Sequence, residues 1–234
     1  MRASPGRVGG VFVVATVVLA LLYLAIGEGP GFAELVRMLT GGETRPDERF
    51  VVAQIRLPRL LVALFGGGAL ATAGVVMQAS FRNPLASPDL VGTAAGAAFG
   101  GALAIVTRFA DAAVVATPLA SLAGAMFVTW LVFVLAGAYG RVSVTGLLLA
   151  GIALNTLVGA LTSFVVTFSF ANYTASSEVL FWLMGGLERS TWTHAWITAA
   201  GFGVFAGLIA PRTRDLDLMT LRDDSAHSLG IDAP

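Results

Sequence analysis

Few side chains in this sequence could carry out chemistry, and they do not gather into a catalytic or metal-binding motif. The sequence has no Cys, which excludes disulfides and thiolate metal sites, and its two His, His194 and His227, lie far apart. Neither a nucleophile–base arrangement nor a GxxxxGK[ST] phosphate-binding loop is present. We therefore predict that the chain is not an enzyme, binds no cofactor or metal and does not itself bind ATP through such a loop.

Two arginines, Arg56 and Arg59, belong to the sequence RLPR at the start of a long apolar stretch. Pro58 is predicted to lie in the first turn of a helix, where its missing N–H is no loss. Side chains three residues apart share one helical face. The pair either snorkels to the membrane surface and anchors the helix end, or binds carboxylates of a docking partner.

Three weakly polar side chains, Asn155, Thr162 and Ser163, lie within a long apolar stretch. Small residues recur every four positions along the same stretch, which gives a flat helix face that another backbone can approach closely. Two interpretations stay open. Either these polar groups line a translocation path, or they form hydrogen bonds between packed helices.

The polar stretch near the end of the sequence, residues 215–230, is too short and too charged to cross a membrane. Leu218, Leu221 and Leu229 can share one helical face, and Gly230 is typical of a helix end. Such an amphipathic helix on the cytoplasmic side suits docking into the groove of a partner protein. The alternative is a helix that lies flat on the membrane.

The elements that must carry these residues are membrane-spanning helices. The 234 residues are 56% hydrophobic and 12% charged, with a mean hydropathy of +0.83, and a soluble domain would carry about 25% charged residues. Net charge is zero, so nothing indicates nucleic-acid binding. The apolar runs are continuous, which favours helices over a barrel. Six spans of roughly 20 residues are predicted, at about 9–27, 60–80, 90–107, 113–137, 144–169 and 193–210.

The first span follows Arg2 and Arg7. It is either a cleaved signal peptide or a retained span whose positive flank places the N-terminus in the cytoplasm. The arginines as a whole divide equally between the two sides and do not determine orientation. Between the first two spans, Phe32, Leu35 and Leu39 have helical spacing and predict a short amphipathic helix at the outer interface.

Four separated blocks, in this order, resemble the FecCD-like permeases, the type II ABC importers for iron-siderophores, haem and cobalamin. The blocks are RLPRLLVALFGGGALATAGVVMQASFRNPLASPDLVGTAAGAAFG, LLLAGIALNTLVGALTSF, EVLFWLMGGL and MTLRDDSAHSLGI. The resemblance implies an all-α, polytopic helical bundle of about ten helices in one permease domain. It also implies a multi-pass protein of the bacterial cytoplasmic (inner) membrane.

The resemblance implies partners and residue roles as well. A second permease subunit, two cytoplasmic ATPase subunits that use ATP and Mg²⁺, and an extracytoplasmic binding protein are expected. Arg56 and Arg59 would meet carboxylates of the binding protein, and Asn155, Thr162 and Ser163 would face the path. The coupling helix seated in the ATPase would contain Leu221, Arg222, Asp223, Asp224, Ser225, Ala226, Leu229 and Gly230.

The sequence departs from the family pattern in its coupling segment. Arg222 replaces the usual Gly, Asp223 and Asp224 replace a Glu pair, and His227 stands where Arg is common. Asp keeps the charge of Glu, so we expect the coupling contacts to survive. The sequence also ends just after this segment, whereas the family continues for about four helices; we expect a fragment or a truncated gene.

The hypothesis from these residues is the transmembrane subunit of an ATP-driven importer for an iron-siderophore or a similar large chelate such as haem or cobalamin. An ATP-independent secondary transporter is the alternative, although it would need an intramembrane ionisable group or a sodium site that the predicted spans do not offer. A membrane scaffold without transport activity is a third possibility, in which the small-residue rows serve assembly only.

Overall fold

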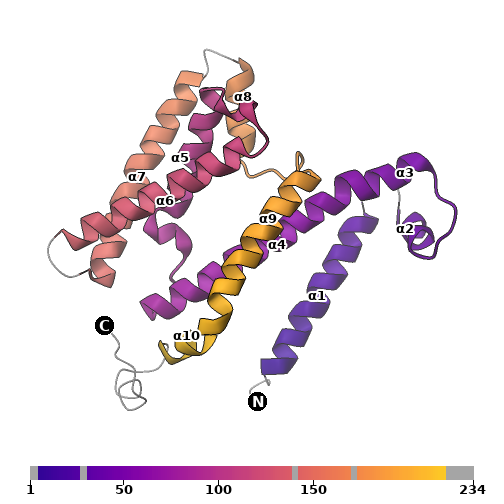
Figure 1. The fold of residues 1–234 in the computed structure, drawn as a ribbon, viewed down its shortest axis with the longest axis horizontal. Helices are drawn as coiled ribbons and strands as arrows, with labels where there is room; N and C mark the ends of the chain where they lie inside the picture. The colour runs from indigo at the N-terminus through magenta and orange to yellow at the C-terminus, as the bar shows by residue number, and fades with distance from the viewer. Residues whose placement is uncertain (1–4, 27–30, 139–141, 170–172, 220–234) are drawn as a thin grey trace. The chain divides into compact units, whose positions relative to one another are not determined.

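The computed structural model describes residues 5–26, 31–138, 142–169 and 173–219. Every regular element in these ranges is helical (Figure 1). The chain forms two compact units. The first unit contains Met1–Gly68 and Leu187–Val204, and the second contains Ala69–Gly186 and Phe205–Pro234.

Five helical stretches in the described residues are long and apolar enough to cross a membrane. They are Gly6–Ala25, Pro46–Phe81, Ala116–Gly137, Val144–Ser169 and Trp192–Leu218. The remaining predicted span, at 90–107, forms the shorter apolar helix α5 (Thr93–Val106) of 14 residues. The all-α, polytopic membrane architecture is confirmed, while the predicted number of long spans is one too high for the described residues.

The first unit begins with α1 (Pro5–Ala25) and the short helix α2 (Phe32–Leu39). Side chains along α1, such as Val11, Phe12 and Leu19, are more than 60% exposed, as expected for a helix whose solvent is lipid. The predicted helix at α2 is confirmed. The carboxylate of Glu34 accepts a hydrogen bond from the N–H of Gly31 at 3.1 Å, which caps its first turn.

A continuous helical stretch follows, made of α3 (Pro46–Phe50), the π-helical turn η1 (Val51–Arg56) and α4 (Leu57–Phe81). Pro58 lies in the first turn of α4, as predicted, but α4 continues an earlier helical stretch and does not begin from a free end. The whole stretch begins at Pro46, which is preceded by the N-cap Arg45. Pro58 lies inside the stretch, and the π-helical turn before it changes the hydrogen-bond register at the point where its N–H is missing.

The helix α9 (Trp192–Ile209) packs along α4 within the first unit. The rings of Phe65 and Phe202 have centroids 6.0 Å apart, and Phe202 also lies against Gly68. Glycine leaves room for the ring because a Cβ at Gly68 would come within 3.3 Å of it. These contacts join two segments that are far apart in sequence.

The second unit contains most of the remaining helices. Besides α5 these are η2 (Pro88–Val91), η3 (Phe109–Ala112), α6 (Ala116–Gly137), α7 (Val144–Ser169), α8 (Tyr173–Leu183), η4 (Ala210–Arg212) and α10 (Thr213–Met219). α5 and α6 cross closely because their contact is made of glycine. A Cβ at Gly96 or at Gly124 would collide with the other glycine's carbonyl oxygen, and one at Gly100 would collide with that of Ala120.

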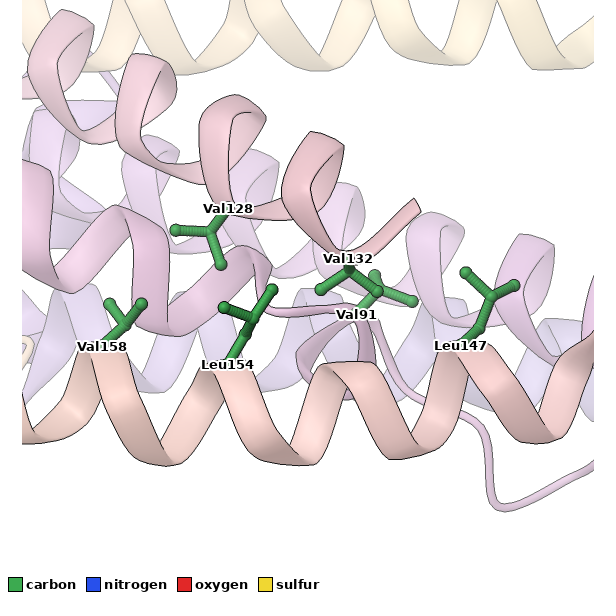
Figure 2. Packing of buried hydrophobic residues seen from close by; sticks show 6 residues of the cluster. All are labelled: Val91, Val128, Val132, Leu147, Leu154 and Val158. Atoms are coloured by element: carbon green, nitrogen blue, oxygen red, sulfur yellow. The ribbon is translucent and has the colours of Figure 1, made fainter. Parts of the chain in front are cut away.

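One apolar core cluster of the second unit is formed by α6, α7 and η2 (Figure 2). α6 contributes Val128 and Val132, η2 contributes Val91, and α7 contributes three more side chains. The full cluster consists of Val91, Val128, Val132, Leu147, Leu154 and Val158. β-Branched side chains next to glycine crossings fill short gaps between backbones, which is the packing expected where lipid removes the hydrophobic driving force between helices.

The connection between α4 and α5 contains two pairs that interrupt helices locally, Asn83-Pro84 and Ser87-Pro88. It ends at Gly92, whose φ of +83° lies in the left-handed region. A side chain at Gly92 would be strained there and would also collide with Val128, because its Cβ would come within 2.7 Å of that residue. Gly92 thus allows the connection to turn at a point where its backbone packs closely against α6.

Candidate functional site

Arg56, the first predicted docking residue, is buried at the end of the π-helical turn and is only 6% exposed. Its Nη1 donates a hydrogen bond of 2.6 Å to the carbonyl oxygen of Leu24, in the last turn of α1. The last carbonyls of a helix have no partner within the helix and carry partial negative charge. A buried guanidinium therefore stabilises this helix end while its own charge is partly compensated.

Arg59, the second predicted docking residue, is half-buried and binds a different segment. Its Nε donates to the carbonyl oxygen of Leu187 at 3.1 Å, and its Nη2 donates to that of Glu188 at 2.9 Å. The planar fork of a guanidinium matches two successive carbonyls. The two arginines therefore hold two different segments of the first unit, α1 and the connection before α9.

A third bond in the same region originates at Trp192, the first residue of α9. Its indole Nε1–H donates to the carbonyl oxygen of Ala53, in the π-helical turn, at 3.1 Å. The ring of Trp192 also stacks on Trp196, with centroids 6.3 Å apart. We call the set of Ala53, Arg56, Pro58, Arg59 and Trp192 the arginine–tryptophan cluster.

Sequence reasoning missed Trp192 as a member of this site. Nothing next to it in the chain indicates that its N–H is needed, because the acceptor is 139 residues away. A signal did exist in Pro58. A proline inside a helix leaves one carbonyl oxygen without its usual donor, and within a membrane such an oxygen needs another one.

The predicted path residues on α7 all belong to the second unit. Asn155 donates through Nδ2 to the carbonyl oxygen of Asp89 in η2 at 2.8 Å. Its Oδ1 is buried and has no hydrogen-bond partner among the described residues. The amide thus holds η2 against α7, next to Gly151, which packs on the carbonyl of Leu90.

Thr162 and Ser163 are satisfied by their own helix. The hydroxyl of Thr162 donates to the carbonyl oxygen of Val158 at 2.9 Å, and that of Ser163 donates to Gly159 at 3.0 Å. This bond lets a hydroxyl lie in an apolar environment at little cost. Thr162 is buried in the second unit, whereas Ser163 is exposed on its surface, so the structure does not place the two on one face.

The predicted coupling residues Leu221, Arg222, Asp223, Asp224, Ser225, Ala226, Leu229 and Gly230 lie outside the described residues. The helix that precedes them in the chain, α10, is described and contains Asp215 in its first turn. In the part of the chain that the structure describes, no group of three or more His, Cys, Asp or Glu side chains could hold a metal ion.

Comparison with known proteins identifies the family. The FecCD transport family matches residues 14–234 of the chain. The chain belongs to this family. In a metal-chelate type ABC transporter solved in an inward-facing conformation, this FecCD fold recurs with a TM-score of 0.78 and 30% sequence identity, over 97% of this chain and 68% of that one.

FecCD relatives with similar sequences carry names that refer to vitamin B12. The cobalamin import system permease protein BtuC of Halobacterium salinarum is 34% identical over 78% of this chain and 48% of its own length. The vitamin B12 import system permease protein BtuC of Escherichia coli is 34% identical over 83% of this chain and 58% of its own length. The chain thus spans about half the length of these relatives.

Proposed function

We propose that the chain forms the membrane-spanning subunit of an ATP-driven importer in the bacterial inner membrane, and that its ligand is a large metal chelate. Membership of the FecCD family, shared over residues 14–234, carries this proposal. Cobalamin is the ligand in the names of similar relatives, and a metal chelate is the ligand class in the name of the similar solved structure. A ferric siderophore, haem and cobalamin all belong to this class.

The proposed partners are a second permease subunit, two cytoplasmic ATPase subunits and an extracytoplasmic binding protein. ATP and Mg²⁺ would be used by the ATPase subunits, which push on residues 221–230. Closure of those subunits would move the helices as rigid bodies and open one side of a path at a time. Helices held by close glycine contacts suit such movement, since they shift as units without deforming.

Arg56 and Arg59 are proposed to take part in binding carboxylates of the binding protein, but they contribute differently. Arg59 is half-exposed, and the two carbonyl oxygens that it binds carry no formal charge to neutralise its own. Arg56 is buried and supports the end of α1. We therefore assign the direct contact to Arg59 and a supporting contribution to Arg56.

An uptake experiment tests the proposed function. The full gene is expressed together with the ATPase and binding-protein genes that neighbour it, in cells that lack their own cobalamin and siderophore importers. Uptake of labelled cyanocobalamin and of a ferric siderophore is measured with ATP depleted and, separately, with the ion gradient collapsed. We expect uptake of one chelate that stops on ATP depletion. Uptake that continues without ATP and stops with the gradient would instead support a secondary transporter.

A further inference from the structure

The strongest unexplained feature of the first unit is a carbonyl oxygen that its own helix cannot satisfy. In the π-helical turn η1, the N–H of Leu57 bonds the carbonyl oxygen of Val52, five residues earlier. The next bond in that register would run from residue 58 to Ala53. Residue 58 is a proline and has no N–H, so the helix offers Ala53 no donor in this register.

Trp192 supplies the missing donor. Its indole N–H lies 3.1 Å from the Ala53 oxygen, in a part-buried position where an unpaired carbonyl would be costly. Pro58 itself is less than 2% exposed, so water or lipid headgroups reach this point poorly. An indole has a single donor and no acceptor, which matches the one N–H that the carbonyl oxygen of Ala53 lacks.

Arg59 fastens the same two segments one turn further along. It binds the carbonyl oxygens of Leu187 and Glu188, and the N–H of Ser190 closes a turn onto Leu187 at 3.0 Å. The connection 187–192 is thus bound to the stretch 53–59 at both of its ends. Both segments belong to the first unit.

We propose that Trp192 is a positioning residue for transport, which latches the start of α9 onto the carbonyl that Pro58 leaves free. This inference rests on the proposed function. The latched turn carries Arg56 and precedes Arg59, the proposed docking residues. The helical stretch Trp192–Leu218 that begins at the latch is followed in the chain by the proposed coupling residues 221–230. Docking therefore acts on a turn to which the beginning of that stretch is bonded.

The proposal has a specific consequence for double substitution. The variant Pro58→Ala supplies an N–H that can bond Ala53, so the latch becomes redundant. Trp192→Phe should therefore speed amide exchange around the latch strongly when residue 58 is proline, and only weakly when residue 58 is alanine. A purely steric contribution of the indole would give the same change in both backgrounds.

Hydrogen–deuterium exchange in the full protein with its partner subunits tests the latch without any ligand. We expect Trp192→Phe to speed exchange of the amides in 51–60 and 189–196 about five-fold, the factor that corresponds to one lost hydrogen bond. In the Pro58→Ala background the same substitution should change exchange by less than about two-fold. The exposed Trp130, which lies in α6, is the matched control, and Trp130→Phe should leave both segments unchanged.

A second variant keeps the test decisive if Pro58→Ala fails to fold. Benzothienylalanine, introduced at residue 192 by codon suppression, retains the size of the indole and replaces its N–H with sulfur. We expect it to reproduce the exchange pattern of Trp192→Phe. Unchanged exchange in this variant would overturn the latch.

The transport contribution is read from the ratio of ATPase activity with and without the binding protein, in proteoliposomes with cyanocobalamin and with a ferric siderophore as probes. We expect this ratio to fall several-fold in Trp192→Phe and to recover in the Pro58→Ala, Trp192→Phe double variant. Benzothienylalanine at residue 192 should lower the ratio as much as Trp192→Phe does. Faster exchange with an unchanged ratio would overturn the positioning role. A different result would contradict the proposed function itself: a wild-type complex that takes up neither probe when ATP is added.

Discussion

At the residue scale, the polar side chains predicted for docking and for the path all donate hydrogen bonds to the chain's own backbone. Arg56, Arg59 and Asn155 donate to carbonyl oxygens of other segments, and Thr162 and Ser163 donate within α7. Backbone carbonyls near helix ends and breaks need such donors where water is scarce. A residue of this kind can still contact a partner or a ligand, and each possibility has its own experiment.

Arg59 tests the proposed docking contact. We expect Arg59→Gln to weaken binding of the binding protein to the full transporter about ten-fold or more, because a charge-assisted hydrogen bond is lost. Arg59→Lys should weaken it less, since the charge remains. Surface plasmon resonance with the complex in nanodiscs measures both affinities. Arg49→Gln, at an exposed arginine of α3, is the control, and equal affinity of wild type and Arg59→Gln would refute the contact.

Ser163 tests the proposed translocation path. The protein has no Cys, so a single introduced thiol reports its own surroundings. We expect Ser163→Cys in the assembled transporter to react with a water-soluble maleimide, and the reaction to slow when ligand-loaded binding protein is present. Leu161→Cys, also exposed on α7 but about 200° away around the helix, is the control and should react slowly. Equal, slow rates at both positions would place Ser163 outside the path.

At the element scale, the close crossing of α5 and α6 depends on the absence of side chains. We expect Gly100→Ala to lower the free energy of unfolding by about 1–3 kcal/mol, because its Cβ would collide with the carbonyl oxygen of Ala120. Gly74→Ala is the matched control. It has open space around its Cβ, and the substitution should be neutral or stabilise by up to ~1 kcal/mol. Unfolding by SDS in mixed micelles measures both, and equal stabilities would contradict the steric account.

The proposed coupling helix is a second element with a clear test. Replacing Asp223 and Asp224 together with Arg reverses the charge that we expect to face the ATPase. The ATPase subunits should then no longer copurify with the full-length permease, and ATP-dependent uptake should be lost. Asp232→Arg, beyond the predicted segment, should do neither. If the double variant retains the ATPase and transports normally, the coupling role is wrong.

At the scale of the whole molecule, the side on which residues 215–230 lie depends on α5. At 1.5 Å per residue the 14 residues of α5 extend about 21 Å, less than the roughly 30 Å of a hydrocarbon core. If α5 nevertheless crosses, six crossings return the chain to the side of its N-terminus. If it does not, the coupling segment lies on the opposite side.

Labelling of single introduced cysteines decides between these topologies. We expect an impermeant thiol reagent to label Thr40→Cys and Ala113→Cys in intact cells, and Ser143→Cys and Ala226→Cys only in inverted membrane vesicles. Labelling at Ala226→Cys from outside the cell would contradict the six-crossing arrangement. It would also remove the coupling segment from the reach of any cytoplasmic ATPase.

The sequence alone predicts the helical class, the amphipathic α2 and six spans, of which five are long helices in the structure and one forms the shorter α5. These features depend on apolar length, helical spacing and the local effect of proline and glycine, all of which can be read along the chain. The sequence also predicts the family, through blocks whose residues keep their order. The first-turn place of Pro58 in α4 was predicted, but the π-helical turn before it was not, because a proline is compatible with a free helix start and with a preceding π-helical turn, and local preference does not distinguish them.

Only the tertiary structure decides which side chain donates to a carbonyl oxygen that has no donor in its own helix. Ala53 loses its helical partner through a local effect, but the N–H that replaces it comes from Trp192. The carbonyl of Leu24 near the end of α1 binds Arg56, and those of Leu187 and Glu188 bind Arg59. Within a membrane an unpaired backbone oxygen costs several kcal/mol, so the chain must find a donor somewhere. The sequence creates that requirement, and the packing of distant helices determines which side chain meets it.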